Sequence, residues 1–536
     1  MLAQGLQQQY SRFTTRATGR LSVSSVEPEI VLRAQRAVVI GSGFGGLAAA
    51  VRLRVMGYEV QVLEALDQPG GRARVFRRDG YTFDAGPTVI TAPYLLEELF
   101  ALAGRRMEDY VGLVPVDPFY RILFHDGSTF DYVQDEERLL AQIAAFNPRD
   151  VDGYRRLAAH AERIFDIGYT QLADQPFDRA RDMIRVIPRM IRLESHRTVY
   201  GLVARYIKDE RLRQAFTFEP LLVGGNPFTT TSIYLLIHWL ERKWGVHFAR
   251  GGTGQIVRGL VSLLEEMDVP VRLDAPVEEI EVANGRASAV RLEGGERIAA
   301  DVVVSNADPS YVYTRMIAPA HRRRNTDRAV ARKRQSMSLF VAYFGSTKTF
   351  PEVAHHTIVL GERYKGLLDD IFTRKRLAPD ASLYLHAPTR TDPSLAPPGH
   401  EALYVLSPVP NNRAGVDWAR ESEPYFARIL EMLDRRVLPG IQQTVTTPSF
   451  LTPHEFEHDL RSVDGAAFGL EPRLTQSAYF RYHNRSDDVA GLYFVGAGTH
   501  PGGGVPGVLS SAKVLERVVP RPAHRASLPA PAGAAR

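Results

Sequence analysis

The sequence predicts an α/β protein in which the nucleotide-binding sheet is discontinuous along the chain. Residues 37–40 form a short apolar run, and Gly41, Gly43 and Gly46 follow it at G-x-G-x-x-G spacing. A second glycine-rich segment, residues 496–507, stands far away, just before the last expected helix. Between the two segments helical and strand-like patterns alternate, which indicates that the chain leaves the sheet and re-enters it.

Composition limits the classes of protein that the chain can represent. Its 536 residues are enough for two or three domains with a buried core. It has no cysteine, which excludes a disulfide framework, a thiolate metal site, a thiol nucleophile and a flavin attached through cysteine. The net charge of +5 favours anionic partners, either nucleic acid or a membrane surface. No apolar run reaches the roughly 20 residues of a spanning helix, so any membrane contact is expected to be peripheral.

Both ends of the chain are expected to lie outside the folded part. Residues 1–34 begin with an arginine- and serine-rich stretch without acids, which resembles an organelle transit peptide. The simpler interpretation, which we prefer, is a disordered extension or an early start codon. Residues 519–536 are rich in proline and alanine and are expected to form a disordered tail.

The first ordered element is predicted to be a β-α-β unit. Residues 37–40 are suited to a buried parallel strand, and the apolar positions that follow can line a helix that Gly57 ends. A second strand over residues 58–63 leads into Glu64. Strand, helix, strand and acid occur in the order that a dinucleotide-binding unit requires.

Each residue of this unit has a physical role. Gly41 permits the tight turn, Gly43 lets a pyrophosphate approach, and Gly46 lets helix and strand pack closely. Glu64 is placed to accept hydrogen bonds from a ribose. A lone G-x-G-x-x-G is often only a tight turn, but the agreement of all four parts favours dinucleotide binding.

A further glycine pair follows directly after this acid. Gly70 and Gly71 supply more open backbone, and Arg72 can lie against a pyrophosphate. Nicotinamide binding does not need such a segment, so it favours a different dinucleotide. The alternative is an ordinary glycine-rich loop that carries a surface arginine.

The rest of the chain alternates between helical and strand-like patterns. Residues 95–244 are mainly helical, and a glycine-rich turn at 251–254 enters an amphipathic helix. Residues 277–307 are predicted to be strands with Asn-Gly and Gly-Gly turns, and residues 341–409 are strand-rich again. A strand at 492–495 precedes the final glycine-rich segment and a helix that is expected to start around Val508.

Several longer stretches make the chain recognisable as a whole. They occur in the order GGRARVF, FDAGPTVIT, FNPRDVDGYRR, LLVGGNPF, FARGGTG, SLYLHAP, LTQSAYFRYHNR and GLYFVGAGTHPGGGVPGVLSSAK. From about Arg36 to Glu516 the chain resembles the bacterial-type phytoene desaturases, flavoproteins of carotenoid biosynthesis in the amine-oxidase-like superfamily. The resemblance implies a Rossmann-like FAD-binding domain, a β-sheet substrate domain and a helical, membrane-facing part.

This resemblance also implies domain boundaries and cofactor contacts. The FAD domain would comprise residues 35–95, 250–310 and 470–518, with a helical membrane or lid region at 96–249 and the substrate domain at 311–469. The implied FAD-binding residues are Gly41, Gly43, Gly46 and Glu64 for the ADP half, Gly71 and Arg72 near the pyrophosphate, Val277 at the adenine, and Gly498, Val505 and Pro506 at the isoalloxazine.

The implied reaction is removal of two hydrogens across a C–C bond of phytoene by hydride transfer to FAD, towards lycopene or earlier intermediates. The implied setting is the cytoplasmic side of a membrane, with oxygen or a quinone as electron acceptor and no nucleic-acid partner. Tyr479, Tyr482 and His247 depart from the family pattern, so the number of desaturation steps stays open. The alternatives are a desaturase or isomerase of another carotenoid (C30 or hydroxylated), a flavin amine oxidase, or a prenyl-lipid carrier without flavin.

Candidate residues for proton transfer lie in the stretch RARDMIR. Asp182 and Arg185 are spaced i, i+3 on an expected helix, which places both on one face. Such a pair has been discussed as catalytic in related enzymes. A surface ion pair explains the same spacing.

The same region, residues 179–197, mixes arginines with apolar residues. Such a helix can lie on an anionic bilayer or pack against a protein core. We favour the membrane, because the implied substrate is carried in lipid. Pro188 would kink this helix or begin a second one.

Histidines suggest two further sites. His355 and His356 are adjacent in an expected strand, so their side chains should point to opposite faces, which favours a structural role over a metal site. His500 lies in the final glycine-rich segment and is a better candidate for a cofactor contact than for a base.

Overall fold

The computed structural model describes residues 34–523 and 526. The predictions for the N-terminal extension, apart from Ala34, and for residues 524–525 and 527–536 of the tail fall outside these residues. Within the described ranges no helix combines the length and the apolar character needed to cross a bilayer. The predicted α/β class is confirmed, because parallel and antiparallel sheets alternate with helices along the chain.

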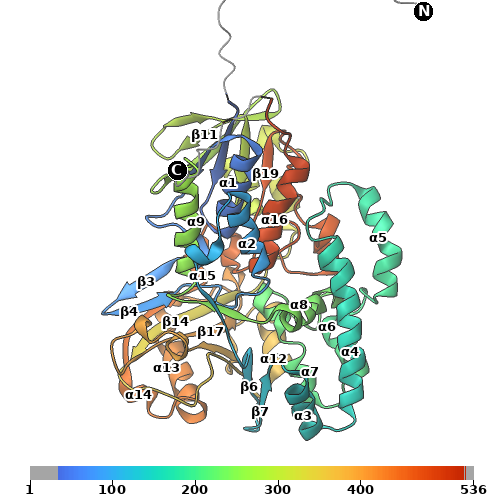
Figure 1. Cartoon of the computed structure of the whole chain (residues 1–536), viewed down its shortest axis with the longest axis vertical. Coiled ribbons are helices and arrows are strands. Elements are labelled where there is room, and N and C mark those ends of the chain that lie inside the picture. Colours follow the sequence, from blue (N-terminus) through green and yellow to red (C-terminus); the bar gives the residue numbers. More distant parts are fainter. Residues whose placement is uncertain (1–33, 524–525, 527–536) are drawn as a thin grey trace, which may run out of the picture. The chain divides into compact units, whose positions relative to one another are not determined.

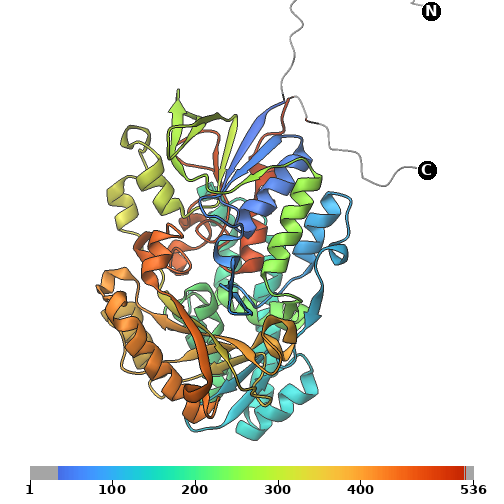
Figure 2. The same cartoon turned by 90° about the vertical axis from the view of Figure 1, so that its left-hand side faces the viewer.

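A five-stranded parallel sheet forms the upper part of the molecule in Figures 1 and 2. Its order is β19-β13-β1-β2-β9, and the strands come from widely separated stretches of chain. Because all five are parallel, their carboxyl ends meet at one edge of the sheet. The strands are β1 (Arg36–Ile40), β2 (Glu59–Leu63), β9 (Val271–Arg272), β13 (Val302–Ser305) and β19 (Leu492–Phe494).

Helices cover one face of this sheet. Alternate residues of β1 divide between the two faces, so Val39 packs against the helices and Val38 faces the opposite way. The helix α1 is rich in alanine and glycine, which allows α16 to lie close against it. The covering helices are α1 (Phe44–Met56), α9 (Gly254–Glu266) and α16 (Val505–Val518).

The other face carries a small antiparallel sheet of β10 (Val277–Ala283), β11 (Arg286–Leu292) and β12 (Arg297–Ala299). Its turns contain Asn284-Gly285 and Gly294-Gly295, all with positive φ. This confirms the predicted Asn-Gly and Gly-Gly turns, since both types need left-handed backbone.

A second large sheet has seven strands in the order β18-β14-β17-β16-β15-β6-β7. Along β14, Phe340 and Phe344 face the long helix α13 (Trp418–Arg436), whereas Leu339, Val341 and Tyr343 face the opposite way. The strands are β6 (Tyr120–Leu123), β7 (Thr129–Tyr132), β14 (Ser338–Ser346), β15 (His356–Val359), β16 (Leu383–His386), β17 (Glu401–Val409) and β18 (Val445–Leu451).

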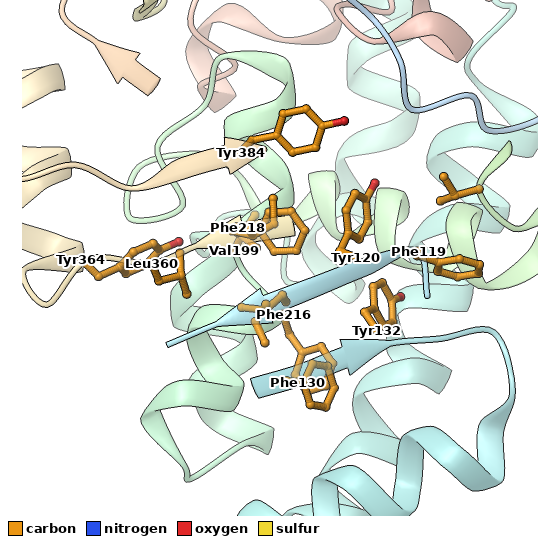
Figure 3. Packing of buried hydrophobic residues seen from close by; sticks show 14 of the residues in the cluster. Phe119, Tyr120, Phe130, Tyr132, Val199, Phe216, Phe218, Leu360, Tyr364 and Tyr384 are labelled. Carbon is orange, nitrogen blue, oxygen red and sulfur yellow. The ribbon is translucent and has the colours of Figure 1, made fainter. Parts of the chain in front are cut away.

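The segment expected to be helical, residues 96–249, therefore contributes two strands to this sheet. Tyr120 and Tyr132 are register partners on β6 and β7, and both are buried. Figure 3 shows their rings among Phe119, Phe216 and Phe218. Four-residue strands with alternate buried residues are too short to stand out from the helical patterns around them.

The helices of this segment lie in several places: α3 contacts β7, α2 contacts α1 and α16, and α5 lies at the right-hand edge of Figure 1. They are α2 (Tyr94–Leu102), α3 (Glu136–Phe146), α4 (Asp150–Phe165), α5 (Ala180–Arg192), α6 (Val199–Tyr206), α7 (Glu210–Ala215) and α8 (Leu236–Trp244). Later helices are α12 (Tyr364–Asp369), α14 (Ile441–Thr444) and α15 (Pro453–His458). The paired strands β3 (Val75–Arg78) and β4 (Tyr81–Asp84), and β5 (Leu113–Pro115) and β8 (His247–Ala249), complete the framework.

A buried carboxyl joins the hairpin β3–β4 to α9. Asp84 is 5% exposed, and its Oδ1 accepts a hydrogen bond from the backbone N–H of Gly254, the first residue of α9, at 3.3 Å. Burial raises the pKa of Asp84 from 3.8 to about 6. Between these two values the folded protein holds a proton that the unfolded chain has released, so ionisation of Asp84 opposes folding.

We therefore expect Asp84 to reduce stability as the pH rises. The free energy of unfolding should fall by up to about 3 kcal/mol from this source between pH 4 and 7, and Asp84→Asn should abolish that fall while its side-chain oxygen can still accept from Gly254. Urea unfolding at several pH values measures the difference. Asp79→Asn, in the exposed turn of the same hairpin, is the matched control. If the free energy of unfolding changed with pH in the same way for wild type and Asp84→Asn, the raised pKa of Asp84 would be contradicted.

Candidate functional site

A cavity of about 490 Å³ runs from the carboxyl edge of the parallel sheet to the face of the seven-stranded sheet opposite α13. Its lining is mostly apolar, with leucine, valine, isoleucine and methionine side chains from both sheets and from α5 and α8. Charged side chains are few and concentrate near the parallel sheet. One end therefore suits a polar ligand, and the other suits a hydrocarbon.

Most of the residues predicted to hold the cofactor lie together at the polar end. The lining includes Gly41, Gly43, Glu64, Gly71, Arg72, Val277, Val505 and Pro506. Gly46 and Gly498 are outside it, because each is packed against backbone or proline. A Cβ on Gly46 would stand 1.9 Å from the carbonyl oxygen of Gly41, and one on Gly498 would stand 2.3 Å from Cδ of Pro309.

Asn306 joins the two glycine-rich segments, and sequence reasoning missed it. It follows β13, its N–H donates to the carbonyl of Ile40 at 2.8 Å, and it lines the cavity. A Cβ on Gly45 would stand 2.4 Å from Oδ1 of Asn306 and 3.0 Å from the backbone N of Gly496. Asn306 therefore fills the space between the first turn of α1 and the segment that directly follows β19. The sequence did offer one signal for Asn306, because it is a polar residue directly after the buried strand β13.

The amino end of α1 can receive a phosphate. No side chain caps this helix, so its first backbone N–H groups keep their capacity to donate. Glu64 is held beside it, since its Oε2 accepts hydrogen bonds from the backbone N–H of Ser42 at 2.7 Å and from its hydroxyl at 2.6 Å. The carboxylate has further lone pairs for ribose hydroxyls.

Arg72 supplies a positive charge inside the molecule. One of its terminal N–H groups donates to Oγ of Ser462 at 2.6 Å, while its Nε has no hydrogen-bond partner in the described part of the chain. Burial lowers the pKa of Arg72, and the nearby Asp308 partly offsets this effect. A guanidinium with an unpartnered donor beside an uncapped helix end fits an anionic pyrophosphate.

The amino end of α16 reaches the cavity as well. The helix begins at Val505, three residues before the expected Val508, because Pro506 fits the first turn, where no N–H is needed. Gly504 precedes it with a φ of 86°, and residues 503–508 all line the cavity. Bare backbone is therefore brought against whatever occupies this end.

A carboxyl group also lines the apolar end. Glu241 on α8 is 1% exposed to solvent and lines the cavity. Its Oε1 accepts a hydrogen bond from the Tyr120 hydroxyl at 2.7 Å, and its Oε2 has no partner within the described residues. Burial raises the pKa of Glu241 well above its ordinary value, and the neighbouring Glu219 raises it further. Burial therefore favours the protonated form of Glu241.

Hydroxyl groups form a short network on the sheet side of the cavity. Oγ1 of Thr88 lies 2.9 Å from the Tyr384 hydroxyl and 2.7 Å from the Tyr404 hydroxyl. The Tyr384 hydroxyl also lies 2.7 Å from Nδ1 of His356. All three hydroxyl-bearing residues line the cavity, so the network connects the cavity surface to a buried histidine.

The proposed acid–base pair lies outside the cavity lining. Asp182 and Arg185 are both on α5, but Asp182 is 3.8 Å from Arg181 in a surface ion pair, and Arg185 is exposed. Instead Met183 and Val186 of the same helix line the cavity. Pro188 does not interrupt α5, which is continuous from Ala180 to Arg192.

Three residues that depart from the family pattern also lie outside the lining. Tyr482 is buried against Tyr313, and its hydroxyl lies 3.1 Å from Oγ of Ser310. Tyr479 packs beside Met183, and His247 belongs to the short strand β8. His500, by contrast, lines the cavity as expected of a ligand contact, and burial lowers its pKa to about 4.

The prediction that His355 and His356 point to opposite faces is wrong. Strand β15 begins at His356, so His355 lies outside the strand, where side chains need not alternate. With His386 on β16 the two histidines form a buried cluster whose ring nitrogens, one from each residue, all lie within 4.8 Å of one another. Burial lowers the pKa of His355 to about 3, and the pKa values of the other two are lowered as well.

Comparison with known proteins places this geometry in a family. Residues 44–514 match the family model described as flavin containing amine oxidoreductase. The chain is 52% identical over 482 residues to the lycopene-forming phytoene desaturase of Pseudescherichia vulneris, covering 89% of this chain and 98% of that protein. It is 45% identical over 491 residues to the neurosporene-forming phytoene desaturase of Rhodobacter capsulatus. That alignment covers 90% of this chain and 94% of the relative.

A solved structure shares the fold. An oxidoreductase from Methanosarcina mazei superposes with a TM-score of 0.62 at 17% identity, covering 90% of this chain and all of that one. At this identity the likeness concerns the fold alone.

Substitution at Gly45 tests the contact between the two glycine-rich segments. In Gly45→Ala the new methyl group must displace Asn306 or Gly496, at a cost of about 1–3 kcal/mol, so flavin binding should weaken roughly ten- to a hundredfold. Flavin absorbance per chain and titration of flavin-free protein with FAD measure this change. Gly112→Ala is the matched control, because its Cβ would meet only Cδ of Arg250, at 3.9 Å. Unchanged flavin affinity in Gly45→Ala would show that the ligand does not depend on this contact.

Proposed function

The chain belongs to the family of flavin containing amine oxidoreductases, and we propose that it is a phytoene desaturase that uses FAD to introduce carbon–carbon double bonds into its substrate. The observation that carries this proposal is a single cavity that joins a dinucleotide-binding turn to an apolar chamber. Sequence identity of 52% over nearly the full length of a lycopene-forming relative supports the same activity.

The polar end fits FAD, because each part of the dinucleotide has a matching group. The uncapped end of α1 and the Arg72 guanidinium suit the pyrophosphate, Glu64 suits the ribose, and the open backbone around Gly504 suits a flat ring. When bound, FAD supplies an acceptor for the hydride that leaves the substrate. We assign this end to a Rossmann-like FAD-binding arrangement.

The apolar end fits a hydrocarbon. Phytoene has no hydroxyl, carbonyl or amine, so its binding must rest on shape and on removal of apolar surface from water. Aliphatic and aromatic side chains of the seven-stranded sheet, α5 and α8 supply such a surface. They orient the substrate and exclude water from the reacting bond.

A proton must also leave the carbon next to the one that loses the hydride. The assignment of Asp182 and Arg185 to this step stays a prediction, and their place outside the lining does not favour it. Glu241 lines the apolar end, but burial raises its pKa and so favours the protonated form, which cannot accept a proton.

The relatives differ in how many double bonds they introduce, so the product of this chain has to be proposed separately. One relative is named as lycopene-forming and another as neurosporene-forming, at 52% and 45% identity. We propose lycopene as the product, because the more similar relative forms it. A desaturase or isomerase of a C30 or hydroxylated carotenoid and an amine oxidase remain the competing activities. Oxygen or a quinone is proposed as the final electron acceptor.

We also propose peripheral attachment to the cytoplasmic side of a membrane through α5. The exposed large apolar side chains of the described residues are Ile184, Ile187 and Ile191 on α5 and Phe480 in a turn that contacts α5. Arginines flank them along the same helix. A basic helix with exposed isoleucines suits an anionic bilayer, and its other side lines the cavity.

Expression in a phytoene-accumulating bacterium tests the activity directly. We expect a red extract with the absorption spectrum of lycopene, because complete desaturation extends the conjugated system. A yellow extract would keep the reaction but show an earlier end product. Gly45→Ala, expected to bind flavin poorly, serves as the control for cofactor dependence. Unchanged phytoene beside folded, flavin-loaded protein would refute the proposed substrate, and peroxide release with amines would then favour an amine oxidase.

Replacing the exposed isoleucines tests membrane attachment. The triple variant Ile184→Ser, Ile187→Ser and Ile191→Ser should bind anionic vesicles at least about tenfold more weakly, because it removes apolar surface that would enter the bilayer. Cosedimentation with vesicles measures binding, and flavin content reports on folding. Ala141→Ser with Ala145→Ser, exposed positions on α3, is the control. Equal vesicle binding by wild type and the triple variant would exclude α5 as the attachment site.

A further inference from the structure

Three histidines meet inside the molecule, away from the residues assigned to FAD. His356 and His386 are register partners on the neighbouring strands β15 and β16, and His355 joins them from just before β15. Their exposed fractions are 5% for His355 and zero for the other two. The Nε2 atoms of His355 and His386 are 3.1 Å apart, close to the separation of about 3.3 Å between two nitrogens bound tetrahedrally to one zinc ion.

The hydrogen bonds of the cluster are incomplete. Nε2 of His356 and Nδ1 of His386 have no partner within the described residues. Buried ring nitrogens normally have partners, since leaving one unpaired costs free energy. Two unpaired nitrogens in one cluster indicate that the three rings alone do not complete the site.

Two of the three rings are oriented by a hydrogen bond to Nδ1, as the rings of metal-binding histidines commonly are. Nδ1 of His355 lies 2.6 Å from Oγ1 of Thr391, and Nδ1 of His356 lies 2.7 Å from the Tyr384 hydroxyl. Metal-binding histidines commonly use one ring nitrogen for the ion and the other for such a hydrogen bond. Among the described residues Nε2 of His356 has no partner, and Nε2 of His355 is within hydrogen-bonding distance only of Nε2 of His386, a contact that a shared ion would replace.

The surroundings also provide an apolar shell and an acid. The Phe248 ring packs against His355 with ring centroids 4.7 Å apart, and the Tyr404 ring packs against His386 at 4.8 Å. Tyr120 lies 5.9 Å from the His356 ring and donates to Glu241. A carboxyl group therefore lies one ring away from the cluster.

We propose that His355, His356 and His386 form a binding site for one divalent transition-metal ion. Three imidazole nitrogens suit zinc and its neighbours, whereas magnesium and calcium require oxygen ligands. The ion would link β15 to β16 behind the cavity wall that Tyr384 and Tyr404 form, a structural role that does not depend on the proposed desaturase activity.

The test uses the full-length, flavin-loaded protein without an affinity tag. After chelator treatment and dialysis against Zn²⁺ alone, elemental analysis should find one zinc per chain, and X-ray absorption should show imidazole nitrogens at about 2.0–2.1 Å. Thr391→Val removes only the hydroxyl beside His355, so it should weaken Zn²⁺ affinity roughly ten- to a hundredfold while flavin content is unchanged. His386→Gln should abolish stoichiometric binding.

A surface site must be distinguished from the buried one. His454 and His458 are exposed and stack on α15 with ring centroids 5.8 Å apart, so they can bind zinc adventitiously. The double variant His454→Gln, His458→Gln should keep the bound zinc. The proposal is overturned if wild-type protein binds no zinc, or if the α15 variant loses it while Thr391→Val and His386→Gln retain full affinity.

Discussion

Close contact between two stretches of bare backbone is the constraint on which the rest of the structure depends. The carboxyl ends of β1, β13 and β19 meet at one edge of the parallel sheet, and Asn306 fills the space between Gly45 and Gly496. Neither glycine can carry a side chain without displacing its neighbours, because a Cβ on either one would overlap the asparagine. The first turn of α1 and the segment after β19 thereby meet at the same point, and the cavity opens from that point towards the second sheet.

Much of the cofactor end is predictable from the sequence because its signals are local. A glycine with left-handed backbone, an apolar strand and an acid at fixed spacing each follow from the conformation of a few neighbouring residues. The β-α-β order, the Asn-Gly turn and Glu64 beside the turn were found in this way. Val277, more than two hundred residues away, was placed only by resemblance to a family, and it does line the same cavity.

The remaining features depend on contacts between distant segments, which no local pattern records. Asn306 and Glu241 have ordinary sequence neighbours, and only the fold brings them to the cavity. The histidine cluster escaped prediction because His355 directly precedes β15 and so falls outside its regular alternation, and because His386 comes from another strand. Asp182 illustrates the converse: helical spacing predicts a shared face, but it does not determine what that face contacts.

The two sides of α5 have a consequence for how rates would be measured. Met183 and Val186 line the cavity, while Ile184, Ile187 and Ile191 are exposed. Under the proposed membrane attachment, a hydrocarbon moves from bilayer to cavity past one helix without dissolving in water. The relevant substrate concentration is then its mole fraction in the lipid. Adding inert lipid at constant total substrate would slow turnover by surface dilution, although the bulk concentration is unchanged.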